Sequence, residues 1–300
     1  MVKLKIADLI IHYLGREEYL NERFYDFLHE GDESPDMTIR VVERRPLFFK
    51  RLLEKGTVID SFSFYQSGND LLQFYPDILH AGIRLIEGNN KYKNTTLYVC
   101  DKLYGRFVKR FGREKYLERM KIIVFNAIQE IFYNRLLFED AMSIHSASVV
   151  YDDKAIVFSA PSGTGKSTQA NLWNKHLGCE ILDGDVTVCR EKGGKLYVYG
   201  LPWCGSSGIY LNREVELGAF VFLKQAKENT IKIPDFREKI SYIYSSTFSE
   251  SLNDEMAQKI ARVTEIIVNK ARIYELSCNM ETEAVTTLKN RLDDAYTGKR

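Results

Sequence analysis

The strongest constraint on the fold is the segment from Ala155 to Leu177, which reads AIVFSAPSGTGKSTQANLWNKHL. Its first five residues, Ala155–Ser159, form an apolar run typical of a buried strand. A glycine-containing loop follows, and the next residues have the spacing of a helix over Gln169–Leu177, which Gly178 is expected to end. A strand, a loop and a helix in this order predict an α/β fold with the loop at the end of a strand.

The loop itself predicts a nucleotide site. Residues 160–167 match the P-loop (Walker A) pattern G-x-x-x-x-G-K-[ST] at every defining position except the first, where Ala160 replaces glycine. Alanine fits there if the chain enters the loop with negative φ. The glycines let backbone N–H groups turn toward an anion, Lys166 brings positive charge to the β- and γ-phosphates, and Ser167 offers a hydroxyl to Mg²⁺. The residues expected to bind the nucleotide are Pro161, Ser162, Gly163, Thr164, Gly165, Lys166, Ser167 and Thr168.

A hairpin is predicted to bring a histidine to this loop. The strand-like runs Ser146–Val150 and Ala155–Ser159 flank the pair Asp152-Asp153. If the runs pair antiparallel about this two-residue turn, His145 lies opposite Ala160, the first loop residue. A three-residue turn would move its partner only to Pro161. We therefore expect His145 at the mouth of the nucleotide site.

Two carboxylates follow the helix, in the run C-E-I-L-D-G-D that ends at Asp185. A strand–helix–strand crossover is right-handed, so the carboxyl end of the second strand should lie near that of the first. A carboxylate beside a P-loop can hold Mg²⁺ or accept the proton of an attacking hydroxyl. Asp183 and Asp185 are both candidates for these roles, and residues two apart in a regular strand point to the same side.

The remaining pattern divides the chain near residue 115. Residues 1–115 read as an α+β domain of unknown role, with strand-like runs at Ile39–Val42, Val58–Tyr65 and Thr96–Val99. Residues 116–300 contain the loop and form the second domain. Helices are expected there from Tyr116 to Phe138, from Asp254 to Lys270 with a capping box starting at Ser251, and from Glu281 to Leu292. Further strands are expected at Val186–Cys189, Leu196–Tyr199, Ala219–Leu223 and Arg272–Leu276.

Charge and composition exclude several classes of partner. The formal net charge is +1, from 42 basic and 41 acidic residues, whereas nucleic-acid binding relies on concentrated positive charge. No apolar run approaches the ~18 residues that cross a bilayer. Asp8 also interrupts the apolar N-terminus that a signal peptide needs. We therefore expect a cytoplasmic protein without nucleic-acid or membrane partners. The five cysteines form no CxxC pair and indicate free thiols rather than a zinc site or disulfides.

The runs HSASVV at 145–150 and AIVFSAPSGTGKSTQA at 155–170 resemble the HPr kinase/phosphorylase family. The piece SGTGKST is also similar to the kinase loop of phosphoenolpyruvate carboxykinases, which share that fold. The later runs ILDGD and YGLPWCG resemble short HPr-kinase-like proteins, including those that phosphorylate serine in lasso peptides. The resemblance spans residues 140–290 and does not extend to the N-terminal domain.

This resemblance implies a mixed β-sheet P-loop kinase core of the HPr kinase/phosphoenolpyruvate carboxykinase type with helices, preceded here by the α+β N-terminal segment. It implies ATP and Mg²⁺ as cofactors, with Ser167 and Asp185 as metal ligands. His145 takes the place of the family's histidine near the γ-phosphate, and Asp185 matches the second residue of its usual Asp-Asp pair. Gly184 stands where the first Asp, the family's proposed base, would be. Asp183 or Asp185 is left to serve as the base.

The leading hypothesis is an ATP- and Mg²⁺-dependent kinase that phosphorylates a hydroxyl, most simply serine, in a peptide, a protein or a small molecule. The catalytic candidates are Asp185, Lys166, His145 and Asp183. A carboxykinase-like enzyme is an alternative, although the chain is short for one. A non-catalytic nucleotide-binding regulator is another, kept open by Gly184. The family's assemblies suggest a homo-oligomer, and the loop Pro202–Gly208 would cover the site or bind the acceptor.

Overall fold

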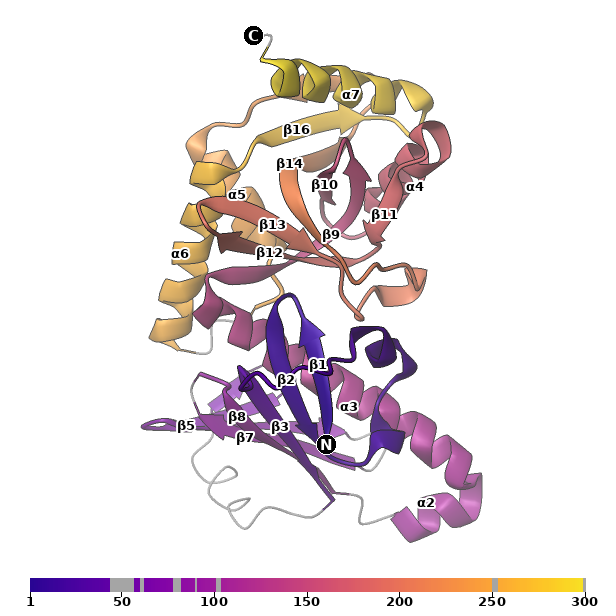
Figure 1. Ribbon diagram of the computed structural model, residues 1–300, viewed down its shortest axis with the longest axis vertical. Helices are drawn as coiled ribbons and strands as arrows, with labels where there is room; N and C mark the ends of the chain where they lie inside the picture. Colours follow the sequence, from indigo (N-terminus) through magenta and orange to yellow (C-terminus); the bar gives the residue numbers. More distant parts are fainter. Residues whose placement is uncertain are drawn as a thin grey trace. The chain divides into compact units, whose positions relative to one another are not determined.

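The computed structural model describes residues 1–43, 57–59, 62–77, 82–89, 91–100, 104–249 and 253–298. The chain forms two compact units, Met1–Arg135 and Leu136–Arg300 (Figure 1). Both units are α/β, each with a mixed sheet of eight strands and associated helices. The expected boundary near residue 115 lies at the start of helix α3 (Arg113–Leu136), whereas this division lies at its end.

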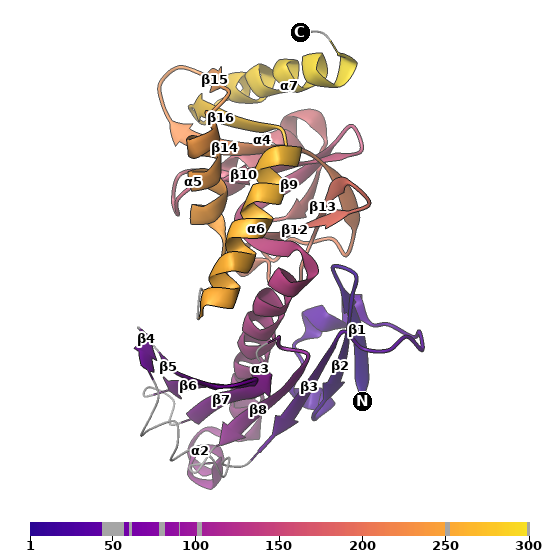
Figure 2. The same ribbon diagram turned by 90° about the vertical axis from the view of Figure 1, so that its left-hand side faces the viewer.

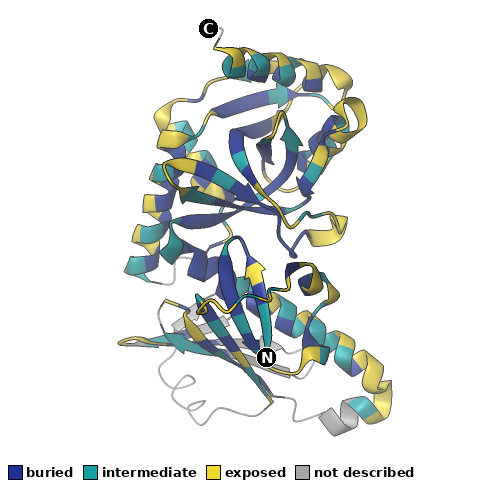
Figure 3. Cartoon of the chain, viewed as in Figure 1, coloured by how far each residue is buried: buried dark blue, intermediate teal, exposed yellow. Residues whose placement is uncertain are grey.

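The N-terminal unit is built on a sheet with the strand order β1-β2-β3-β8-β7-β6-β5-β4. β2 pairs parallel with β3, and β3 parallel with β8, whereas the other neighbours are antiparallel. Helix α3 buries Val124, Ile128 and Ile131 completely, as its helical spacing predicts, and Phe125 meets Phe24 edge to face. Figure 3 colours the described residues by how far each is buried. The described elements of this unit besides α3 are β1 (Val2–Ile6), β2 (Leu9–Leu14), η1 (Glu17–Tyr19), η2 (Glu22–Phe27), β3 (Met37–Val42), β4 (Thr57–Ile59), β5 (Phe62–Ser67), β6 (Asp70–Asp77), β7 (Gly82–Asn89), β8 (Asn94–Cys100) and α2 (Tyr104–Phe111).

The sheet of the C-terminal unit has the strand order β10-β9-β12-β13-β14-β16-β15, with β11 beside β9. β14 has three neighbours: Glu214–Glu216 pair with β13, Glu216–Phe222 pair parallel with β10, and Phe220–Gln225 pair parallel with β16. The elements are η3 (Leu137–Glu139), β9 (Ala141–Tyr151), β10 (Lys154–Ser159), α4 (Lys166–Leu177), β11 (Glu180–Asp183), β12 (Val186–Lys192), β13 (Lys195–Tyr199), η4 (Gly205–Ser207), β14 (Glu214–Gln225), β15 (Thr230–Lys232), α5 (Phe236–Ser246), α6 (Asp254–Lys270), β16 (Ile273–Cys278) and α7 (Thr282–Thr297).

The predicted hairpin is confirmed in its register. Ser159 pairs with Ser146 and Ala155 with Val150, which is the pairing expected about a two-residue turn. The turn residues Asp152 and Asp153 have φ values of 51° and 56°. Left-handed φ at both positions defines the type I′ turn that suits the twist of a hairpin.

Helices cover the C-terminal sheet on both faces (Figures 1 and 2). Side chains alternate along β14, so Val221 and Leu223 join the apolar cluster of α4 and α7, while Phe222 stacks against Tyr242 of α5. The helix Asp254–Lys270 was predicted with these bounds. Its N-cap is Asn253, whose side chain accepts a bond from the Met256 N–H. Ser251, the expected cap, lies outside the described residues.

Candidate functional site

The candidate phosphate loop, residues 160–167, joins β10 to α4. Gly163 and Gly165 have φ values of 78° and 120°, which side chains rarely adopt, whereas Ala160 has no positive φ, as expected. Gly165 caps α4 without a side-chain hydrogen bond. The first N–H groups of a helix lack partners within the helix, so this N-terminus offers donors and a positive dipole to an anion.

Lys166 lies inside the loop. Its side chain is buried, and Nζ donates to the carbonyl oxygen of Ala160 at 3.0 Å. Burial lowers the pKa of Lys166, and the charge of Asp185 opposes this shift. The hydrogen bond to Ala160 therefore holds the ammonium group at the loop, within range of the negative charge of Asp185.

His145 and Asp185 are adjacent, with Nε2 of the histidine 3.5 Å from Oδ1 of the aspartate. Neighbouring strands fix both residues, because His145 in β9 pairs with Val186 in β12 and the Ser146 N–H donates to the Asp185 carbonyl at 2.9 Å. Both side chains are partly exposed, at 30% and 39%. The structure therefore places an imidazole beside an accessible carboxylate, and the charge of that carboxylate also acts on Lys166.

Asp183 has a different position from Asp185. It is fully buried, and its oxygens accept bonds from the N–H groups of Asp185 (2.9 Å), Val186 (3.0 Å) and Leu201 (2.9 Å). Burial raises the pKa of Asp183 to about 7, against the backbone donors, which lower it. The two aspartates do not face the loop together, because β11 ends at Asp183 and Asp185 lies beyond it. Asp183 holds the backbone around Asp185 and is closed to a ligand.

The loop Pro202–Gly208 packs against the D-G-D segment. A Cβ atom added to Gly184 would lie 2.2 Å from Ser207 Oγ, so the serine side chain occupies the space that a larger residue at 184 would need. A Cβ atom on Gly205, which has a φ of 60°, would lie 2.6 Å from Asp185 Oδ2. Gly184 N also donates to the Ile209 carbonyl at 3.1 Å. Gly184 and Gly205 therefore permit a close contact between this loop and Asp185.

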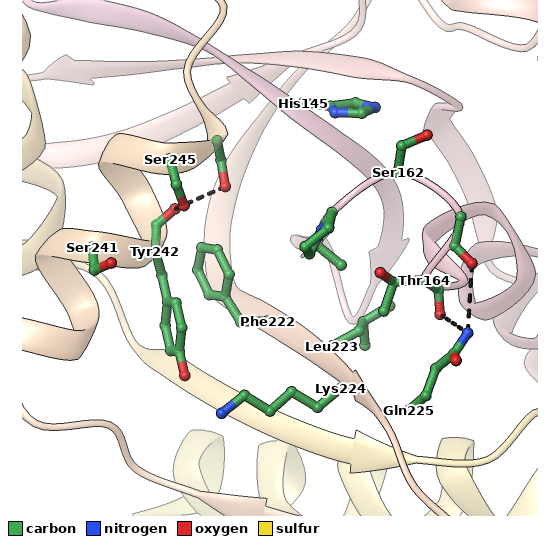
Figure 4. Close-up of a pocket in the computed structure, with 14 residues that line it drawn as sticks. His145, Ser162, Thr164, Phe222, Leu223, Lys224, Gln225, Ser241, Tyr242 and Ser245 are labelled. Atoms are coloured by element: carbon green, nitrogen blue, oxygen red, sulfur yellow. Dashed lines mark hydrogen bonds between the residues drawn. The ribbon is translucent and has the colours of Figure 1, made fainter.

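A cavity of about 1020 Å³ opens beside the candidate phosphate loop (Figure 4). Its other walls are the end of β14 and helix α5. Gln225 connects the wall to the loop, since its Nε2 donates to the carbonyls of Gly163 (3.5 Å) and Thr164 (3.3 Å). The lining residues are His145, Ala160, Pro161, Ser162, Gly163, Thr164, Phe222, Leu223, Lys224, Gln225, Ser241, Tyr242, Ser245 and Ser246.

Sequence reasoning missed the whole α5 wall of this cavity. Its aromatic and apolar residues Phe236 and Tyr244 are exposed, at 56% and 54%, so they mark no buried helical face. One signal was available: Asp235 and Glu238 have the spacing of a capping box, and both of its hydrogen bonds are present.

The oxygen donors fit Mg²⁺ in kind. Ser167 presents an exposed hydroxyl at the start of α4, and Asp185 presents a partly exposed carboxylate. Mg²⁺ is typically bound by one or two protein oxygens together with phosphate and water. In the part of the chain that the structure describes, no group of three or more His, Cys, Asp or Glu residues is placed to hold a metal ion. The donor set thus suits an ion that arrives with a nucleotide.

Comparisons with known proteins find a likeness among solved structures. No family model matches the chain, and no curated protein matches it. Among solved structures, the chain is similar to the Hpr(Ser) kinase/phosphatase from Coxiella burnetii, at 10% sequence identity and a TM-score of 0.29. The match covers 50% of this chain and 95% of that one. Separately, none of the helices within the described ranges has the length and apolar character to span a bilayer.

Proposed function

We propose that the chain is an ATP- and Mg²⁺-dependent kinase of the HPr-kinase-like type. It would transfer the γ-phosphoryl group of ATP to a hydroxyl, most simply a serine, and its C-terminal unit would be a P-loop kinase core. The observation that carries the proposal is the His145–Asp185 contact of 3.5 Å beside a loop whose helix N-terminus has no side-chain cap. Donors that hold the phosphates and a group that accepts the proton of the attacking hydroxyl are two recurring parts of phosphoryl-transfer sites.

The tasks of the transfer reaction are divided among these residues, and Asp185 has two of them. The backbone of the candidate phosphate loop and the Lys166 ammonium hold the triphosphate and offset its charge. The acceptor oxygen attacks the γ-phosphorus while its proton passes to the Asp185 carboxylate, and the bond from the γ-phosphorus to the bridging oxygen breaks to leave ADP. His145 orients Asp185 across their 3.5 Å contact. Mg²⁺, with Ser167 and Asp185 as protein ligands, supplies further neutralisation of the phosphate charge when bound.

Asp183 is a positioning residue in this scheme. Its carboxyl group ties the Asp185 N–H to the Leu201 N–H, and so connects the proposed base to the loop that packs over it. A buried group with all of these partners has no access to an acceptor hydroxyl. The proton is therefore assigned to Asp185.

One observation favours a second candidate, the non-catalytic nucleotide-binding regulator. Gly184 stands at the position where the resembling family has its base, and glycine has no side chain to accept a proton. Ser207 fills the space beside it. A regulator would use the same loop to bind nucleotide and would transfer nothing.

The deciding experiment incubates the protein with Mg-ATP and a library of serine-containing peptides and small hydroxyl compounds. Mass spectrometry then searches for phosphorylated products. The kinase predicts products with the wild type and none with Lys166→Ala or Asp185→Asn. Nucleotide binding without transfer to any acceptor would support the regulator, and absence of nucleotide binding would refute both.

A further inference from the structure

The transfer chemistry proposed above uses no residue from the α5 side of the cavity beside the candidate phosphate loop. The loop residues Ser162 and Thr164 form one wall, and Tyr242 and Phe222 lie across from them on the α5 side (Figure 4). His145 lines the cavity, but its partner Asp185 does not. His145 therefore stands between the cavity and the proposed base.

This arrangement separates two directions of approach, provided that the proposed function holds. An acceptor hydroxyl must come within hydrogen-bond reach of Asp185 to transfer its proton. That position lies outside the cavity lining. The nucleoside and the acceptor lie at opposite ends of the triphosphate, so they must approach the loop from different sides. The cavity is the space beside the loop, and Asp185 is not in its lining.

The walls of the cavity suit an uncharged planar group. The rings of Phe222 and Tyr242 stack at 4.5 Å between centroids with an interplanar angle of 18°. The lining contains no Asp or Glu, and its Lys224 is neutralised by Glu275, whose carboxylate lies 2.8 Å from Nζ. Tyr242 donates its hydroxyl to the same Glu275. An anionic phosphate would find no unpaired cation on this wall.

Hydroxyl groups supply much of the polar lining, beside His145, Lys224 and Gln225. Ser245 is exposed and donates to the Tyr242 carbonyl at 3.2 Å, which leaves its oxygen free to accept a bond. Pockets for small ligands combine apolar and aromatic walls with a few polar groups that fix orientation. A nucleobase with its ribose has this character, since the base stacks and the sugar hydroxyls form hydrogen bonds.

We propose that this cavity is the nucleoside site of the protein. The base lies against the Phe222–Tyr242 pair, the ribose hydroxyls face Ser245, and the phosphates run from there onto Ser162–Thr164. α5 is then the element that selects nucleotides over other polyphosphates.

The test compares Mg-ATP with Mg-tripolyphosphate, which has the phosphates without the nucleoside, by isothermal titration calorimetry. Stacking of a base on an aromatic side chain contributes about 1–3 kcal/mol, so Tyr242→Ala should weaken ATP binding roughly 5- to 150-fold. Its affinity for tripolyphosphate should not change. Tyr242→Phe keeps the ring and should bind ATP with the affinity of the wild type. Tyr244→Ala is the matched control, because Tyr244 is 54% exposed on the same helix and does not line the cavity.

A second variant covers the case in which Tyr242→Ala unfolds the helix. Ser245→Phe adds a large ring to the cavity from an exposed position, and it should block ATP while tripolyphosphate still binds. Equal ATP affinity in wild type, Tyr242→Ala and Ser245→Phe would overturn the nucleoside site, as would equal losses for both ligands. The proposed function fails separately, if the wild type binds neither ligand or Lys166→Ala binds both normally.

Discussion

The close packing of Ser207 against Gly184 predicts that an alanine at position 184 destabilises the C-terminal unit. In Gly184→Ala the new methyl carbon would lie 2.2 Å from Ser207 Oγ and 2.7 Å from Ser207 Cβ. Two bonds hold that serine, one to the Cys204 carbonyl at 2.6 Å and one from the Ile209 N–H at 3.2 Å. Gly184 has no positive φ, so the alanine meets a steric cost and no backbone strain. Overpacking of this kind typically costs about 1–3 kcal/mol.

Removing Ser207 should relieve the clash. Ser207→Gly alone loses two hydrogen bonds of a partly exposed side chain, about 0.5–1.5 kcal/mol each at most. In the double variant Gly184→Ala/Ser207→Gly, the alanine occupies the vacated space. We therefore expect a favourable coupling energy of roughly 1–2 kcal/mol, within the range measured for residues in contact. Ser206→Gly is the matched control, because it adds the same loop flexibility without opening that space.

Tryptophan fluorescence during denaturant unfolding measures these differences. Both tryptophans of the chain, Trp173 and Trp203, are buried in the C-terminal unit, so the signal reports that unit. Trp203 also lies within the loop that Gly184→Ala would displace. Unfolding of Gly184→Ala at the wild-type denaturant concentration would contradict this prediction, as would a rescue by Ser206→Gly equal to that by Ser207→Gly.

Four further predictions concern the nucleotide site. Lys166→Ala should abolish phosphoryl transfer with a normal melting curve, and unchanged turnover would remove the loop from the mechanism. Mg-ATP at ~100 times Kd should stabilise the wild type by about 2.7 kcal/mol, measured by thermal unfolding, and should not shift Lys166→Ala. Asp185→Asn should lower turnover roughly 10²- to 10⁴-fold and more than His145→Gln, and the reverse order would reassign the base. Asp183→Asn should lower the free energy of unfolding by about 1–3 kcal/mol, because an amide has one acceptor oxygen in place of the two that accept N–H bonds here. A denaturant midpoint equal to that of the wild type would count against the positioning role.

The sequence predicted best the parts of the site that local physics determines. A two-residue turn allows one antiparallel pairing, so the register that brings Ser159 opposite Ser146 followed from counting residues. The helix Asp254–Lys270 followed from its periodic apolar face, of which Ile260, Val263 and Ile267 are buried. The roles of the site residues stay predictions.

Other features depend on contacts that no local pattern records. The first hairpin, β1–β2, turns at Ala7 and Asp8 with φ values of 46° and 64°, and alanine gives no signal for such a turn. The residues alone left both Asp183 and Asp185 open as the base. The burial of Asp183, to which the distant Leu201 N–H contributes a bond, distinguishes the two. The packing of Ser207 on Gly184 is likewise a long-range contact.

β14 pairs with three other strands, and this affects how the chain folds while it is being synthesised. The β9–β10 hairpin can form as soon as it leaves the ribosome, because its two strands are contiguous. The other edge of β10 stays unpaired until residues Glu216–Phe222 of β14 have been synthesised. β16 pairs with β14 later still. Until then Ile156 and Phe158, both fully buried in the finished unit, belong to an open strand edge. Such an edge is a template for pairing with another chain, so translation pauses between β10 and β14 should favour aggregation or chaperone binding.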